Sequence, residues 1–204
     1  METSDLLFDY VGLHEGTPPA WTHFYTCNLS ISTQAVRDVG GFDEDYKYAL
    51  AEDTELGRRL ALEAGMELRF DPNIRATHDH DLDIDRYGKR AFLLGRENYR
   101  TSRKHNDLSI LWSENIEIDD CDESWLKIRP FLETTRPHIQ TLVRDVRNLD
   151  RLRMDVDSPR FAECLEGLKN LVGTVLQHEY WRGVVSAWSE FDEDDYDRPQ
   201  KLIH

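Results

Sequence analysis

The chain has 204 residues, of which 39% are hydrophobic, so it is long and apolar enough to bury a core. Its 40 acidic residues against 25 basic ones give a formal net charge of -15, which opposes binding to DNA, RNA or an anionic lipid surface. The three cysteines, Cys27, Cys121 and Cys164, lie far apart without C-x-x-C spacing, so we expect neither a disulfide framework nor a thiolate zinc site. The acidic N-terminus and the lack of a long apolar stretch predict a cytoplasmic protein with no secretory signal and no transmembrane segment.

The first half of the chain alternates strand-like with helix-like segments. Residues 23–32 are rich in aromatic and β-branched side chains, which is typical of a strand, and Ser32 or Thr33 can cap the helix that follows. The segments expected as strands are 23–32, 66–72 and 74–80, and those expected as helices are 32–41, 53–64 and 84–105. Alternation of this kind predicts an α/β fold.

From about residue 107 the pattern is helical almost throughout. Pro130 and Pro137 are expected to interrupt the first of these helices, because proline lacks an N–H and clashes with the preceding turn. Ser158 is expected to cap the last helix, with Pro159 in its first turn. We expect these helices to pack on one another and on the preceding domain, with docking of a partner as the functional alternative.

An acidic pair, Glu52 and Asp53, stands at the start of the helical segment 53–64. Free backbone N–H groups and the helix macrodipole favour carboxylates at this position, so the pair can be a plain helix start. The same position keeps a carboxylate ionised, as a general base requires. The pair alone does not decide between the two interpretations.

Two histidines lie close together in the strand-like segment 74–80. Side chains alternate between the faces of a strand, so His78 and His80 are expected on the same face. Imidazole is a common ligand of divalent transition metals such as Mn²⁺. A structural or surface role is the alternative for an isolated His-x-His.

The segments CNLSIS, VGGFDE, AEDTELGRRLALEAG, MELRFDPNIRATHDH and GRENYR follow one another between Trp21 and Arg103. Their order and spacing resemble the C-terminal half of the catalytic domain of family 2 glycosyltransferases, a galactosyltransferase C-terminal-like region with the GT-A fold. The resemblance implies a partial GT-A half-domain at residues 21–106, after a lead-in at 1–20 and before a helical region at 107–190 and an acidic tail at 191–204. It also implies transfer of a sugar, with inversion, from a nucleotide-sugar donor to a hydroxyl of a glycan or lipid-linked acceptor.

The resemblance assigns roles to residues by position. Asp53 is implied as the general base, with Glu52 orienting the acceptor or holding the turn. His78 is implied as a ligand of the Mn²⁺ or Mg²⁺ that neutralises the donor's diphosphate, and His80 is a second candidate. Asn28 lies where the family's strand faces the substrate cleft, and an ordinary hydrogen bond is the alternative role for this polar residue. An aromatic stripe can be an acceptor-sugar platform or ordinary core, and consists of Trp21, His23 and Tyr25.

The first half of that family's domain, with its nucleotide-binding strands and D-x-D motif, has no counterpart here. Asp43-Glu44-Asp45 has the letters of the motif but follows Gly-Gly-Phe, so we expect a solvated turn. The sequence therefore predicts an incomplete, truncated enzyme: a fragment, a remnant, or one part of a split enzyme whose separate chain supplies the nucleotide-binding half. The alternative is a noncatalytic helical interaction protein that carries a degenerate glycosyltransferase segment.

Overall fold

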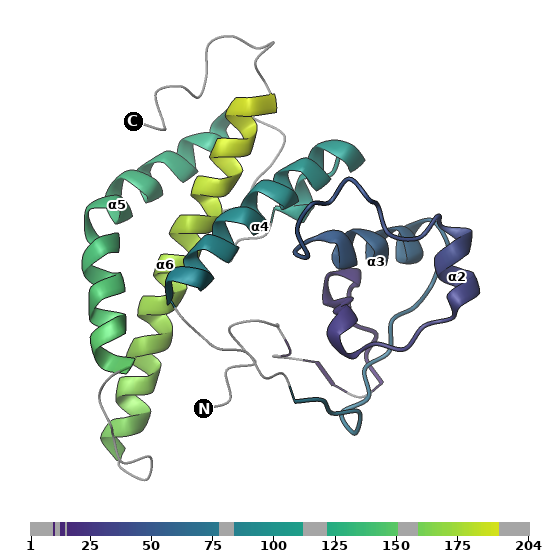
Figure 1. Ribbon diagram of the computed structural model, residues 1–204, viewed down its shortest axis with the longest axis horizontal. Helices are drawn as coiled ribbons and strands as arrows, with labels where there is room; N and C mark the ends of the chain where they lie inside the picture. Colours follow the sequence, from purple (N-terminus) through teal and green to yellow (C-terminus); the bar gives the residue numbers. More distant parts are fainter. Residues whose placement is uncertain are drawn as a thin grey trace. The chain divides into compact units, whose positions relative to one another are not determined.

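The computed structural model describes residues 10, 13–14, 16–77, 84–111, 122–150 and 159–191, apart from side chains near the ends of the last two helices (Figure 1). The chain divides into two compact units, Met1–Asp81 and Leu82–His204. Each unit is described by itself below.

The α/β fold expected from the sequence is wrong, because no β-strand forms within the described residues. The segment expected as the first strand instead begins in two 3₁₀ turns, η1 (Trp21–His23) and η2 (Thr26–Asn28). Residues 29–32 and 66–70 do alternate half-buried with exposed side chains, as strands would, but they form no ladder with another described segment. Side-chain alternation shows which face a segment buries, whereas a strand also needs a neighbour for its backbone.

The first unit contains two helices among its described residues, α2 (Thr33–Asp38) and α3 (Glu52–Leu62). The side chain of Ser32 caps α2 by accepting a hydrogen bond from the N–H of Ala35 at 3.4 Å, as the sequence predicts. Gly65, with a φ of 65°, follows the end of α3. The core is small, and its members are Phe24, Leu56 and Leu60, with Leu29, Ile31, Ala35, Val36, Val39, Met66 and Leu68 packed partly buried against them.

A buried ion pair ties the turn after α2 to α3. Glu55 is fully buried, and its two carboxylate oxygens accept hydrogen bonds from Arg59 at 2.7 to 3.0 Å. Arg59 also donates to the carbonyl oxygens of Val39 and Gly41, the latter at 2.7 Å. The guanidinium therefore fixes the turn at Gly40 and Gly41, whose positive φ values of 88° and 78° suit glycine.

The described part of the second unit consists of α4 (Ile84–His105), η3 (Leu108–Ile110), α5 (Asp122–Asp150) and α6 (Pro159–Phe191). Helix α4 crosses α6, and α5 lies along α6 (Figure 1). Glycines permit the crossing, because a Cβ at Gly95 would lie 2.0 Å from the carbonyl oxygen of Tyr180, and one at Gly183 would lie 1.9 Å from that of Phe92. The buried residues of this core are Tyr99, Leu111, Ile128, Leu132, Tyr180, Trp181, Val184, Val185, Ala187 and Trp188.

The helices of the second unit match their expected positions with one exception. Helix α4 has the bounds expected from the sequence, and α6 begins at Pro159 as expected, while Ser158 lies outside the described residues. The interruption expected at Pro130 and Pro137 is wrong, because α5 continues through both prolines. The helix absorbs them by curving along its length (Figure 1).

Candidate functional site

The acidic pair lies in the first turn of α3, as the sequence predicts, with Ala51 at the N-cap position. Oδ1 of Asp53 accepts a hydrogen bond from the N–H of Thr54 at 2.7 Å. Oδ2 of Asp53 lies 3.5 Å from the N–H of Thr26, which belongs to η2. The start of α3 therefore meets the 3₁₀ turn η2 at the carboxylate of Asp53.

A glycine inside α3 brings the two 3₁₀ turns close to this carboxylate. A Cβ at Gly57 would lie 2.4 Å from Cβ of Phe24 and 3.0 Å from the carbonyl oxygen of Trp21, so only glycine fits. Asp53 and Gly57 are four residues apart and share a face of the helix. On that face η1 packs against Gly57, and η2 contacts Asp53. These two contacts position residues 25–28 beside the acidic pair.

Burial raises the pKa of the Asp53 carboxyl above its ordinary value, and the charge of Glu52 adds to this rise. The N–H groups of Thr54 and Thr26 act in the opposite direction, because they stabilise the carboxylate. The ionising effect expected from the helix start is thus outweighed by desolvation. A carboxylate with a raised pKa is a stronger base when it is ionised, which suits proton abstraction.

Glu52 differs from its neighbour in its hydrogen bonding. Its side chain is half-buried, and Oε2 is buried without a hydrogen-bond partner among the described residues. A buried carboxylate oxygen without a donor is unfavourable. The pair therefore combines a carboxylate that accepts backbone hydrogen bonds, Asp53, with a buried oxygen of Glu52 that accepts none among the described residues.

Aromatic rings and a thiol lie in the segment of the chain that contacts Asp53. The ring of Tyr25 meets that of Tyr10 edge to face at 5.6 Å between centroids, and that of His23 at 6.2 Å. Cys27 is exposed as a residue, but partial desolvation of its sulfur, together with the negative charge of Asp53, raises the pKa of its thiol. Burial, and then the charge of Cys27, raise the pKa of the Tyr10 hydroxyl. These electrostatic effects link Tyr10, Cys27 and Asp53 into one neighbourhood.

The other site residues expected from the sequence are Asn28, Trp21, His78 and His80. Asn28 donates a hydrogen bond from Nδ2 to the carbonyl oxygen of Ile74 at 3.3 Å, which is a structural contact, and its substrate role stays a prediction. Trp21 is half-buried in η1, where its carbonyl oxygen faces Gly57, so the strand geometry that placed its ring beside Tyr25 does not apply. His78 and His80 lie outside the described residues. Among the residues that the structure does describe, no group of three or more His, Cys, Asp or Glu side chains could hold a metal ion.

Four residues of this neighbourhood were not identified as site residues from the sequence, namely Tyr10, Thr26, Cys27 and Gly57. Gly57 carries a signal, because a glycine inside a helix indicates close approach of another backbone. Thr26 contributes through its backbone, which no side-chain pattern reveals. Tyr10 and Cys27 carry no motif and are assembled by tertiary contacts.

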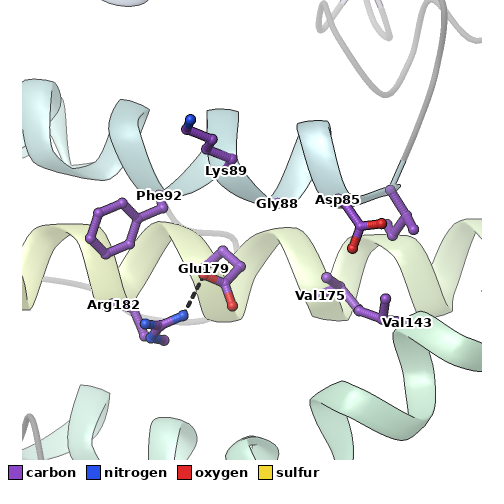
Figure 2. A pocket seen from close by; sticks show the side chains of 9 residues that line it. Asp85, Gly88, Lys89, Phe92, Val143, Val175, Glu179 and Arg182 are labelled. Atoms are coloured by element: carbon purple, nitrogen blue, oxygen red, sulfur yellow. Dashed lines mark hydrogen bonds and ion pairs between the residues drawn. The ribbon is translucent and has the colours of Figure 1, made fainter.

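A second candidate is a cavity of about 340 Å³ among α4, α5 and α6 (Figure 2). Phe92, Val143 and Val175 contribute apolar surface to it. Its acidic groups are already paired, because Glu179 accepts a hydrogen bond from Arg182 at 2.6 Å and Asp85 binds Arg147. The side chain of Lys89 points away from α6 in Figure 2. With its acidic groups bound to internal partners, this cavity is a weaker candidate than the acidic pair.

Comparison with known proteins gives one partial similarity. The chain is 42% identical over 64 residues to a pre-mycofactocin glycosyltransferase of Mycobacterium tuberculosis (strain CDC 1551 / Oshkosh), and equally to that of strain ATCC 25618 / H37Rv. The match covers 31% of this chain and 13% of each relative, so the chain spans about an eighth of the length of the curated relatives it matches. No protein-family model matches the chain, and no solved structure is similar to it. One segment of the chain is thus similar to a glycosyltransferase.

The structure also bears on membrane insertion. Within the described residues, none of the helices combines the length and the apolar character that a membrane crossing requires.

Proposed function

We propose that this chain is the acceptor-side part of a family 2 glycosyltransferase that transfers a sugar, with inversion, from a nucleotide-sugar donor to an acceptor hydroxyl. The observation that carries the proposal is the acidic pair at the start of α3. There burial raises the pKa of Asp53, and Glu52 keeps one buried oxygen without a partner among the described residues. The 64-residue similarity to a glycosyltransferase supports the same class of reaction.

In this proposal Asp53 is the general base. The acceptor oxygen forms a bond to the anomeric carbon while the bond from that carbon to the diphosphate breaks on the opposite face. The hydroxyl proton moves to the carboxylate of Asp53 late in the transition state, and the nucleoside diphosphate leaves with the bonding electrons. Glu52 accepts a hydrogen bond from the acceptor at Oε2 and so orients it. Tyr25, Trp21 and Asn28 are kept as proposed contacts of a glycan or lipid-linked acceptor, as the resemblance implies.

The negative charge of the leaving diphosphate needs neutralisation. Following the resemblance to family 2 glycosyltransferases, we assign the proposed Mn²⁺ or Mg²⁺ to His78, with His80 as a second ligand. When bound, the cation would supply positive charge to the phosphates. We further propose that a separate chain supplies the nucleotide-binding half.

The test is release of nucleoside diphosphate by the chain co-expressed with a polypeptide that binds sugar nucleotides through a D-x-D motif. Asp53→Asn is expected to lower turnover by about 10²- to 10⁴-fold, since that is the usual contribution of a positioned general base. Asp45→Asn is the matched control, because Asp45 lies exposed in the turn after Asp43 and is expected to leave turnover unchanged. Full activity of Asp53→Asn would refute the assignment of the base.

A second candidate function is that of a noncatalytic helical interaction protein. The second unit favours it, because α4, α5 and α6 form the larger core of the chain. A chain that stays inactive with every sugar-nucleotide-binding partner, while the three helices remain folded, would support this candidate.

A further inference from the structure

The cavity among α4, α5 and α6 has apolar walls. Val175 is buried, whereas Ile84, Phe92 and Val143 are half-buried and line the same space. Val143 and Val175 lie toward one end of the cavity and Phe92 toward the other (Figure 2). Ile84 and Phe92 are eight residues apart on α4, so this wall is about 12 Å long. An aliphatic chain of medium length fits along such a wall and removes its apolar surface from water.

A glycine provides part of this space. Gly88 lines the cavity, and a Cβ at Gly88 would lie 3.5 Å from Cγ of Glu179, which is an ordinary contact. At Gly95 and Gly183 in the helix crossing, a Cβ would instead lie 2.0 and 1.9 Å from a backbone oxygen. The crossing therefore requires its glycines, whereas Gly88 has room for a side chain. The volume of about 340 Å³ is within the range of small-molecule sites, which begin at roughly 300 Å³.

Among the described residues around the cavity, one cation has no partner. Asp85 accepts hydrogen bonds from Arg147, with Nε at 3.1 Å, and Glu179 accepts one from Arg182 at 2.6 Å. Both carboxylates are therefore neutralised. Lys89 also lines the cavity and makes no hydrogen bond or ion pair with any residue that the structure describes. The lining, together with Arg147, thus has an excess of one positive charge.

The charge of the whole chain has the opposite sign. With a formal net charge of -15, the chain as a whole attracts cations and repels anions. Salt at physiological concentration screens charges that lie more than about 8 Å away, so the groups at the cavity decide which ligand binds there. A preference of this acidic chain for a negatively charged ligand would therefore point to the cavity.

We propose that this cavity binds a free amphipathic molecule with an aliphatic chain and a single negatively charged group, such as a fatty acid. The aliphatic chain lies along Phe92 and Val175 and reaches Val143. Lys89, which is exposed, turns its flexible side chain toward the carboxylate at the rim. The inference goes beyond the proposed function and does not depend on it, because every residue that it uses belongs to the second unit.

Isothermal titration calorimetry of the full chain with sodium decanoate tests the proposal. Decanoate is expected to bind up to about 15-fold more tightly than octanoate, since each buried methylene contributes roughly a factor of four. Decyltrimethylammonium has the same aliphatic chain with a positive charge, and it is expected to bind more weakly than decanoate although the net charge of the protein favours it. A preference for the cation, or equal affinity for octanoate and decanoate, would overturn the proposal.

Variants that fill the cavity locate the binding site. Gly88→Leu fills it from α4 and is expected to weaken decanoate binding by about tenfold or more. Gly167→Leu is the matched control, because Gly167 is exposed on α6 with nothing within 4 Å of an added Cβ, and we expect unchanged affinity. Thermal unfolding by circular dichroism shows whether Gly88→Leu is folded, and Val143→Phe fills the cavity from α5 if it is not. Wild-type affinity in a folded variant with a filled cavity would place decanoate elsewhere and refute the site.

A lysine substitution tests the position of the carboxylate. Lys89→Met is expected to weaken decanoate binding by about two- to fivefold, which is the usual contribution of an exposed ion pair. Lys47→Met is the control, because Lys47 is an exposed lysine of the first unit and is expected to leave the affinity unchanged. An equal loss in both variants would mean that decanoate responds to the overall charge of the protein and not to Lys89.

Lipid vesicles distinguish a free ligand from a membrane surface. The chain is expected not to cosediment with vesicles of equal parts phosphatidylcholine and phosphatidylglycerol, because its net charge opposes binding to an anionic surface. Cosedimentation without saturable binding of decanoate in solution would identify a lipid surface as the target and overturn the proposal.

Discussion

Among its described residues the first unit buries the apolar side chains of Phe24, Leu56 and Leu60, together with Ala51, and exposes large hydrophobic side chains such as Phe42 and Ile74. The second unit instead packs aromatic and aliphatic side chains around a crossing of two helices at glycines. The first unit also contains an ion pair with a fully buried carboxylate, that of Glu55 with Arg59. Among the described residues, the second unit therefore has the larger apolar core.

Substitution of the glycines at the helix crossing is expected to unfold the second unit, which is the largest effect that we predict. Gly95→Ala and Gly183→Ala each place a methyl group about 2 Å from a backbone carbonyl oxygen, which no side-chain rotation relieves. We expect each variant to lose the thermal unfolding transition of α4 and α6, measured by circular dichroism and hydrogen exchange. Gly173→Ala is the control, because nothing lies within 4 Å of its added methyl, and it is expected to stabilise α6 by up to about 1 kcal/mol. A cooperative transition near the wild-type temperature in Gly95→Ala would contradict this view of the crossing.

Removal of the positive charge of Arg59 tests what stabilises the first unit. Arg59→Met removes the guanidinium that binds the buried carboxylate of Glu55 and the carbonyl oxygens of Val39 and Gly41. We expect a loss of about 3–5 kcal/mol in the free energy of unfolding of this unit, measured by urea titration with exchange of α3 amides as the readout. The exposed pair of Arg129 with Glu133 provides the control, because Arg129→Met is expected to change stability by less than about 0.5 kcal/mol. If Arg59→Met and Arg129→Met changed the free energy of unfolding equally, the ion pair of Glu55 with Arg59 would not be important for the stability of the first unit.

The sequence predicted local structure better than it predicted pairing. The bounds of α4 and the start of α3 follow from helical spacing and acidic residues, which are properties of neighbouring residues. The strands expected at 23–32 and 66–72 did not form in the described residues, because a strand depends on a second segment. The acidic pair was identified from its position, but the contact of Thr26 with Asp53, and those of the Tyr10 and His23 rings with Tyr25, arise only through the fold. Nothing in the sequence indicates that α5 continues through Pro130 and Pro137.

A buried histidine gives the second unit a dependence on pH. His178 is 3% exposed, and burial, with the charges of Arg182 and Arg136 adding to it, lowers its pKa to about 4. Thr135 donates its hydroxyl hydrogen to the carbonyl oxygen of Phe131 at 2.7 Å, so its oxygen accepts from Nδ1–H of His178 at 2.6 Å, which requires that tautomer.

The unfolded chain takes up a proton at this histidine near pH 6.5, whereas the folded chain does so near pH 4. Stability is therefore full above pH 6.5 and falls as the pH drops, by about 3 kcal/mol at pH 4. We expect His178→Asn, which keeps a side-chain donor, to flatten this part of the profile in urea titrations of α6 between pH 4 and 7. The same slope in His178→Asn as in the wild type would assign the pH dependence to other groups.

The smallest expected effect has the opposite sign and lies in the first unit. Because burial raises the pKa of Asp53, the folded chain binds the proton more tightly than the unfolded chain. The stability of the first unit therefore falls as the pH rises from the unfolded pKa of an aspartate through the raised folded pKa, and the loss persists at neutral pH. Asp53→Asn keeps an oxygen for the N–H of Thr54 without the charge, so we expect it to be slightly more stable than the wild type at pH 7 and equal to it at low pH.

Urea titration with exchange of α3 amides, at both pH values, measures the difference between Asp53→Asn and the wild type. A variant that is more stable and yet inactive would show that the buried carboxylate is kept for chemistry at the expense of folding. A less stable variant would instead assign Asp53 to the plain role of starting the helix, through its contact with η2. That outcome would mean that Asp53 contributes to the folding of the first unit and has no catalytic role.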